Sequence, residues 1–220
     1  RAATLAEQAV GPMFAENEMA GSASDVVRKL GEDAVYRQAF QKVYGGPVTM
    51  EFVVDAIVAY EMSVYVIDTP FDRYSAGDAS ALTPAAQRGM ALFRDKARCA
   101  ECHAGINFTD EDFHVLGVSN QQGRAVVTGK DKDVGAYKTP SLRNVALTAP
   151  YMHDGSVATL EEVIELYDRG GNARENLDKR MTRLNLTAQE KADLVAFMHS
   201  LTGTLIDLDG RPFSSSGLPQ

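Results

Sequence analysis

The sequence lacks tryptophan altogether, has only two cysteines in 220 residues, and contains no long uninterrupted apolar run. A membrane-spanning helix needs roughly 20 apolar residues, and the most apolar stretch, residues 53–67, is interrupted by Asp55 and Glu61. The sequence therefore predicts a soluble protein without a membrane span. A formal net charge of −8 argues against a nucleic-acid partner. The chain begins at Arg1 without an initiator methionine or a signal peptide, so we expect a processed or truncated product.

The two cysteines stand three positions apart in the run CAECH, residues 99–103. Two thiols at this spacing can add to the two vinyl groups of one porphyrin, and the adjacent His103 can then reach the iron. A thioredoxin-like dithiol and a chance match in a loop are the alternatives, but no strand-like segment precedes the motif. The motif therefore predicts a c-type haem attached through Cys99 and Cys102. Because such attachment follows export, we expect a periplasmic location.

Capping residues divide the first third of the chain into helices. Ser22 and Asp33 can each begin a helix, and Thr49 is expected to begin a long apolar helix that ends near residue 68. Residues 1–21 have no clear helical period and are expected to be irregular after a short helical turn. Residues 71–81 are polar and predict a connector. These elements indicate an all-helical lobe.

The second part of the chain opens at Thr83 and Pro84, which can begin the helix that leads into the haem motif. We therefore place a domain boundary between residues 81 and 82. Residues 105–138 are rich in Gly, Asp, Asn and Lys, and they predict a long excursion around the haem edge with at most a small hairpin. Within it, residues 124–128 are β-prone.

Two capping-box patterns follow, one formed by Thr159 with Glu162 and one by Thr187 with Glu190. They predict helices that run to about residues 168 and 201, and residues 211–220 predict a polar, mobile tail. The fold expected is all-α, with a helical lobe over residues 1–81 and a cytochrome c-like haem domain over residues 82–220.

Several separated runs resemble the bacterial di-haem cytochrome c peroxidase family, including its MauG-type branch. The most extensive are KTPSLRNV at residues 138–145 and PYMHDG at residues 150–155. The others are NEM at residues 17–19, PFDR at 70–73, GR at 123–124 and YDRGG at 167–171. The resemblance spans nearly the whole chain, and agreement at separated motifs is more specific than the haem motif alone.

The resemblance implies two c-type haems, one near the N-terminus where peroxide reacts and one in the C-terminal domain that supplies it with electrons. This chain carries only the second attachment motif. In relatives, the first motif and an inter-haem tryptophan lie upstream of the position that corresponds to Arg1. We therefore interpret the chain as the C-terminal portion of a longer protein. A natural single-haem form is the alternative.

On the haem carried here, His103 is expected to be the proximal iron ligand. The resemblance implies Tyr167 as the sixth ligand, as in the MauG-type branch. The peroxidases of the family have a methionine at the corresponding position. Met152, His153 and an open site are the alternatives. Arg143 is expected to pair with a haem propionate, because a guanidinium can bind a carboxylate through two hydrogen bonds. A surface salt bridge is the simpler interpretation of Arg143.

On the peroxide side, Glu18 resembles the family's pocket carboxylate, which can move a proton between the two peroxide oxygens. Gln8 and Pro12 would line the same pocket. Taken without the family, a lone glutamate in a loop is more often a solvated charge. Thr148 and Pro150 match positions whose carbonyl oxygens bind calcium in relatives, and an ordinary proline turn is the alternative there.

The leading functional hypothesis is a di-haem peroxidase that reduces hydrogen peroxide at the haem of the missing segment. The expected partners are a small c-type cytochrome or cupredoxin as electron donor and, because relatives form dimers, a second copy of the chain. A monohaem electron carrier would need Cys99, Cys102 and His103 but not Glu18. A MauG-like enzyme that oxidises a protein substrate is suggested by Tyr167. A chain without haem would be an inactive scaffold.

Overall fold

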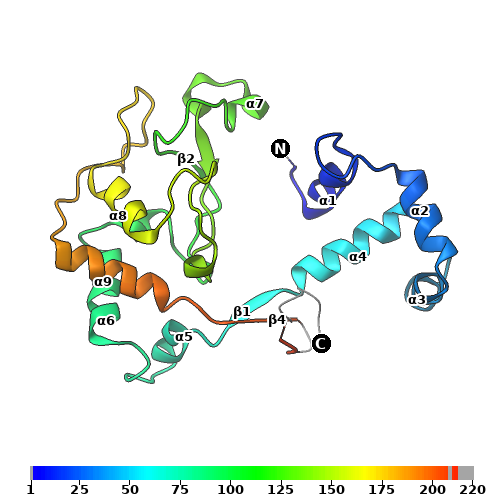
Figure 1. Cartoon of the computed structure of the whole chain (residues 1–220), viewed down its shortest axis with the longest axis horizontal. Helices are drawn as coiled ribbons and strands as arrows, with labels where there is room; N and C mark the ends of the chain where they lie inside the picture. The colour runs from blue at the N-terminus through cyan, green and yellow to red at the C-terminus, as the bar shows by residue number, and fades with distance from the viewer. Residues whose placement is uncertain (1, 208–209, 213–220) are drawn as a thin grey trace. The chain divides into compact units, whose positions relative to one another are not determined.

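The computed structural model describes residues 2–207 and 210–212, and it confirms the predicted mostly helical fold. Within these residues lie nine α-helices and four short strands, which pair as β1 with β4 and β2 with β3. The chain divides into two compact units (Figure 1). The first contains the residues before Val66 and those from Ile206 onward, and the second contains Val66–Leu205. No helix in this described part combines the length and the apolar character that a bilayer crossing demands.

The first unit contains four helices, and each begins after a residue whose side chain accepts a backbone N–H of the first turn. Thr4, Ser22, Asp33 and Thr49 are these residues, which confirms the three predicted starts. Asp33 also ends the second helix, so the second and third helices are joined without a loop. The helices are α1 (Leu5–Phe14), α2 (Ala23–Glu32), α3 (Ala34–Tyr44) and α4 (Met50–Met62).

A small apolar core joins α2, α3 and α4 through Phe40, Val48 and Val53. The ring of Tyr44 stacks on that of Phe52, with centroids 4.4 Å apart and planes 10° apart. This stack fixes the end of α3 against the start of α4.

Two predictions for this unit are wrong. Helix α1 replaces the irregular structure expected near the N-terminus, although Pro12 lies inside it. Helix α4 ends at Met62, sooner than predicted. The Ser63 hydroxyl donates to the Tyr60 carbonyl oxygen at 2.6 Å, and a side chain that competes for backbone groups in this way favours a helix end. The chain then extends as strand β1 (Tyr65–Ile67).

The second unit begins with a short helix where a connector was expected, because Thr69 and Asp72 form a capping box. The predicted starts at Thr83, Thr159 and Thr187 are confirmed. The helices are α5 (Pro70–Ser75), α6 (Pro84–Arg94), α7 (Ala125–Thr128), α8 (Leu160–Asp168) and α9 (Ala188–His199). The strands are β2 (Phe113–Val115), β3 (Ala136–Lys138) and β4 (Thr204–Ile206), and the 3₁₀ helices are η1 (Cys99–Glu101), η2 (Asp131–Asp133) and η3 (Val145–Leu147).

Strands β2 and β3 form the hairpin-like sheet expected in the long excursion. They pair antiparallel, with His114 opposite Tyr137. The β-prone residues 125–128 are not part of this sheet and instead form α7. Gly129 ends α7 in the left-handed region, and its N–H donates to the Ala125 carbonyl oxygen at 2.8 Å. This closed turn explains why a segment rich in valine is helical here.

The core of the second unit lies between α6 and α9. Leu194 and Leu201 have none of their surface exposed. Phe197, on α9, meets the rings of Phe93 and Phe108 edge to face, with centroids 5.2 and 6.2 Å apart. The aromatic cluster therefore joins the two helices to the loop after the haem motif.

Helix α6 crosses α9 at Gly89. A Cβ atom at this position would lie 1.9 Å from the Asp193 carbonyl oxygen, so only glycine allows so close an approach. The Arg88 guanidinium and the buried Asp193 carboxylate form two hydrogen bonds of 2.7 Å beside the crossing. The crossing fixes the end of α6, from which the haem motif continues.

The compact units and the predicted domains have different bounds. Arg143 binds both carboxylate oxygens of Asp72, at 3.0 and 2.9 Å, and this contact belongs to the second unit although Asp72 precedes the predicted boundary at residues 81 and 82. That boundary stays a prediction. Most of the predicted tail, residues 213–220, lies outside the described residues.

Candidate functional site

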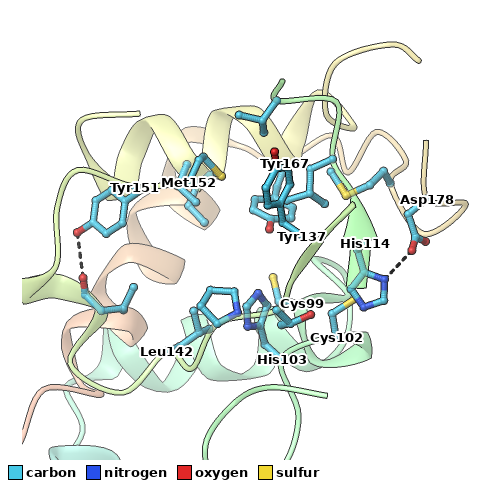
Figure 2. Close-up of a pocket in the computed structure, with 18 of the residues that line it drawn as sticks. Cys99, Cys102, His103, His114, Tyr137, Leu142, Tyr151, Met152, Tyr167 and Asp178 are labelled. Atoms are coloured by element: carbon cyan, nitrogen blue, oxygen red, sulfur yellow. Dashed lines mark hydrogen bonds and ion pairs between the residues drawn. The ribbon is translucent and has the colours of Figure 1, made fainter. Parts of the chain in front are cut away.

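The haem motif forms a tight turn after α6. Arg98 adopts a left-handed conformation, with φ 55°, and turns the chain into η1. The His103 N–H then donates to the Cys99 carbonyl oxygen at 2.8 Å. Cys99 and Cys102 are free thiols, and both line one cavity together with His103 (Figure 2). A single turn therefore presents all three predicted haem-attachment residues to the same space.

His103 has the orientation and charge of an iron ligand. Its Nδ1 atom lies 2.9 Å from the Phe108 carbonyl oxygen. Because a carbonyl oxygen only accepts, Nδ1 carries the hydrogen and Nε2 keeps its lone pair. Burial lowers the pKa of His103, so the ring is neutral at neutral pH. Phe108 belongs to the aromatic core, and the core thereby sets the direction of the imidazole.

The two thiols are protonated at neutral pH. Burial raises the pKa of Cys99 to about 12 and that of Cys102 to about 11. A catalytic dithiol needs the opposite shift, because its reactive form is the thiolate. The environment of these cysteines therefore disfavours the thioredoxin-like alternative.

A cavity of about 380 Å³ lies between the haem motif and α8. Figure 2 shows Cys99 and His103 on one side of it and Tyr167 and Met152 on the other. Much of the lining is apolar and includes Phe93, Leu142, Leu160, Ile164, Leu184 and Met198. The lining suits a flat, largely apolar group with an iron at its centre, because apolar side chains would shield much of its surface from water.

Tyr167 lines the cavity from the last turn of α8. Burial raises the pKa of its phenol. Tyr167 is half-buried and faces the cavity, and its hydroxyl makes no hydrogen bond within the described residues. An iron ion in the cavity would supply the missing partner by binding the phenolate. Donor chemistry and position therefore fit a haem with His103 on one face and Tyr167 on the other.

One wall of the cavity carries paired charges. His114 is 8% exposed, and its ring nitrogens lie 2.8 Å from the carboxylates of Asp110 and Asp178. Burial opposes ionisation of Asp110, but hydrogen bonds that include the one to His114 lower its pKa to about 2. The Arg180 guanidinium, 2.7 Å from Asp178, lowers the pKa of that carboxyl. Because Cys102 Sγ lies within 4.8 Å of the Asp110 and His114 donor atoms, this group lies beside an attachment point.

The structure brings most residues predicted for this haem to one cavity. Met152, Thr148 and Pro150 line it as well. Arg143 does not line it, because its guanidinium pairs with Asp72 and its side chain is 11% exposed. The interaction of Arg143 with a haem propionate stays a prediction.

The predicted peroxide-side residues lie in the first unit. Gln8 and Pro12 are four positions apart on α1 and share a helix face. The Met19 N–H donates to the Pro12 carbonyl oxygen at 3.2 Å, which folds the segment with Glu18 back toward α1. Glu18 is exposed there. The structure thus places Pro12 and the Glu18 segment side by side.

Sequence reasoning missed two sets of residues at the cavity. Arg98, Lys138 and Arg180 are the cationic side chains among its lining residues. Tyr137 lines it too, stacked on His153 with ring centroids 3.5 Å apart, whereas the sequence offered His153 only as an alternative sixth ligand. No local pattern announces either set, because the contacts join segments that are distant in the sequence.

Two family models match successive parts of the chain. The model described as di-haem cytochrome c peroxidase matches residues 1–80, and the cytochrome c model matches residues 86–202. The chain is 37% identical over 209 residues to the methylamine utilization protein MauG of Methylophilus methylotrophus, which covers 92% of this chain and 62% of the relative. It is 37% identical over 214 residues to the cytochrome c peroxidase Ccp of Escherichia coli K12, and this match covers 92% of this chain and 44% of the relative. The chain therefore spans less than two thirds of the length of these relatives.

Solved structures show the same similarity. A MauG-like protein associated with microbial copper homeostasis superposes with a TM-score of 0.84 at 35% identity, over 91% of this chain and 69% of that chain. The diheme peroxidase BthA from Burkholderia thailandensis E264 gives a TM-score of 0.74 at 26% identity, over 100% of this chain and 68% of that chain.

Proposed function

Because the chain belongs to the di-haem cytochrome c peroxidase and MauG family, we propose that it is part of an oxidoreductase that reduces hydrogen peroxide to water. Peroxide reacts at a haem bound by a preceding segment, and electrons reach that haem through the one attached at Cys99 and Cys102. The observation that carries this proposal is the apolar cavity with His103 on one side and Tyr167 on the other.

The cytochrome c domain implies a c-type haem, which when bound supplies an iron that exchanges single electrons. The chain's own residues hold and insulate it. Cys99 and Cys102 would hold its edge through thioether bonds, and His103, oriented by the Phe108 carbonyl oxygen, would offer Nε2 to the iron. Tyr167 offers a hard anionic oxygen, which favours ferric over ferrous iron.

We assign proton transfer on the peroxide side to Glu18. Its carboxylate is exposed in the first unit, next to the Pro12 segment. A carboxylate in reach of bound peroxide takes the proton from one oxygen and returns it to the other, which assists cleavage of the bond between them. Gln8 and Pro12 line the same pocket in this proposal.

Glu18→Gln in the full-length protein is expected to lower kcat/KM for hydrogen peroxide by about 10²- to 10⁴-fold, the usual contribution of a positioned acid and base. The measurement is steady-state turnover with a reduced small c-type cytochrome or cupredoxin as donor. Glu16→Gln, an exposed carboxylate of the same segment, is the matched control and should retain full activity. A full-length protein whose haem spectrum does not change on mixing with peroxide would contradict the proposed function.

A MauG-like enzyme that oxidises a protein substrate is the second candidate, favoured by Tyr167 and by the similarity to MauG. Tyr167→Phe keeps the ring but removes the oxygen donor, so it is expected to change the ferric haem spectrum and to raise the midpoint potential. Tyr36→Phe is the control, because it removes the same oxygen from an exposed tyrosine of α3 that does not line the cavity. An unchanged spectrum in Tyr167→Phe would shift the assignment to Met152.

A monohaem electron carrier is favoured by the single attachment motif in this chain. Haem stoichiometry of the complete gene product by pyridine haemochrome separates the two classes. Two haems per chain support the enzyme, and one supports the carrier.

The remaining proposals concern the setting of the protein. We assign it to the periplasm, with a small c-type cytochrome or a cupredoxin as donor and a second copy of the chain as partner. The carbonyl oxygens of Thr148 and Pro150 are proposed to bind calcium, since carbonyl oxygens suit a hard cation. Both residues line the haem cavity.

A further inference from the structure

Tyr137 and His153 form a stacked pair at the wall of the haem cavity. Their ring centroids are 3.5 Å apart, their planes differ by 15°, and both side chains line the cavity. Tyr137 is half-buried, whereas His153 is exposed. The pair therefore stands between the cavity and solvent, and covalent attachment of the haem uses neither ring.

Tyr137 is the fixed member of the pair. It lies in β3 directly opposite His114 of β2, and residues at opposite positions of an antiparallel pair point to the same face. His114 is anchored on that face by Asp178 (Figure 2) and by Asp110. The Tyr137 hydroxyl donates to the Gln121 side-chain oxygen at 3.3 Å. The sheet therefore holds the Tyr137 ring in one orientation.

His153 belongs to the loop that also carries Met152. Met152 has φ 69°, a left-handed conformation that is unfavourable for a residue with a side chain. On one side of Met152, the loop is held by Tyr151, whose hydroxyl donates to the Val145 carbonyl oxygen. On the other side, the Gly155 N–H donates to the Met152 carbonyl oxygen at 3.3 Å, and a bridge between Tyr151 and Val157 closes the loop. The His153 ring itself makes no hydrogen bond within the described residues, so its stack on Tyr137 is the contact that ties this ring to β3.

We propose that Tyr137 and His153 are positioning residues that set the sixth coordination position of the haem iron. Their stack keeps the Met152 loop against β3, on the same side of the cavity as Tyr167, where the loop would cover the sixth position of a bound haem against added ligands. Without the stack, the strained backbone at Met152 relaxes, the loop moves away from the cavity, and the sixth position opens to added ligands. This proposal rests on haem attachment at the CAECH motif and not on reactivity with peroxide.

The test uses the 220-residue chain loaded with haem, in which there is one attachment motif, and measures cyanide binding to the ferric form by stopped flow. His153→Ala removes the stack at an exposed position, where folding is not at risk. Loss of one aromatic pair is expected to accelerate cyanide binding roughly tenfold and to shift the absorption spectrum and the midpoint potential. His153→Phe restores a flat ring and is expected to return all three readouts toward those of the unmodified chain.

Two further variants separate the stack from its surroundings. Tyr137→Leu removes the other ring and should accelerate cyanide binding to the same extent as His153→Ala. Gln122→Ala changes the exposed neighbour of Gln121, leaves the hydrogen bond to the Tyr137 hydroxyl in place, and should bind cyanide at the unmodified rate. The proposal is overturned if His153→Ala leaves rate, spectrum and potential unchanged, or if His153→Phe does not reverse the effect. Absence of a reaction with peroxide would count against the proposed function and leave this outcome unaffected.

Discussion

A variant in which serine replaces both Cys99 and Cys102 is expected to contain no covalently bound haem. A serine hydroxyl does not add to a porphyrin vinyl group under the conditions in which a thiol does, so both thioether bonds are lost. The His103 imidazole and the apolar walls of the cavity remain, and they are sufficient only for reversible binding. All haem should therefore be extracted by acidified acetone, whereas the unmodified chain should keep its haem on a denaturing gel.

The two single variants are the matched controls for this experiment. Cys99→Ser and Cys102→Ser each keep one thiol at the same cavity, and each should retain haem through one thioether bond. The absorption maximum of the reduced haemochrome reports how many vinyl groups have reacted. Covalent haem in the double variant would contradict the interpretation of the motif.

Gly89→Ala is expected to lower the free energy of unfolding by about 2 kcal/mol, although alanine is the better helix former. Helix propensity alone favours the substitution by about 1 kcal/mol. Against it, the added methyl group would lie 1.9 Å from the Asp193 carbonyl oxygen and 2.9 Å from the Phe197 Cβ atom. The nearest atoms belong to the backbone of Asp193, which cannot change rotamer as a flexible side chain can. Helices α6 and α9 must therefore move apart. Overpacking of about 1–3 kcal/mol and the exposure of Leu194 then outweigh the propensity gain.

Gly31→Ala provides a control of opposite sign. Gly31 lies in α2, and a Cβ atom there would meet no other atom within 4 Å. The substitution should therefore raise the free energy of unfolding by up to about 1 kcal/mol. Urea denaturation of the haem-loaded chains, followed by circular dichroism, measures both changes. A Gly89→Ala chain as stable as the unmodified one would show that the helices do not cross as closely as described.

Helix starts could be predicted from the sequence because each depends on a few adjacent residues. Ser22, Asp33 and Thr83 cap helices in the structure as expected. The end of α4 could not be predicted in the same way. It depends on whether the Tyr60 carbonyl oxygen accepts a hydrogen bond from the backbone of a continuing helix or from a nearby side chain. The Ser63 hydroxyl donates to it, so the helix ends before the apolar pattern of the sequence does.

The same distinction applies to the candidate site. The haem motif is local, so Cys99, Cys102 and His103 could be identified, and the family resemblance pointed to Tyr167. The stack of Tyr137 on His153 could not be predicted, because it forms only after a strand and a distant loop come together. The assignments of Glu18, Gln8 and Pro12 remain predictions that rest on the resemblance.

Arg143 has a consequence for how this protein can be divided. Its guanidinium donates to the Asp72 carboxylate and to the Ile106 carbonyl oxygen, and it thereby ties the loop that carries Arg143 to both segments. A fragment that starts at Leu82, close to the start of the cytochrome c match, would leave this nearly buried cation without its carboxylate, at a cost of about 3–5 kcal/mol. A fragment that starts at Val66 keeps the pair. A stable haem-binding fragment of this chain therefore has to include Asp72, which lies among the residues that the di-haem peroxidase model matches and not among those of the cytochrome c match.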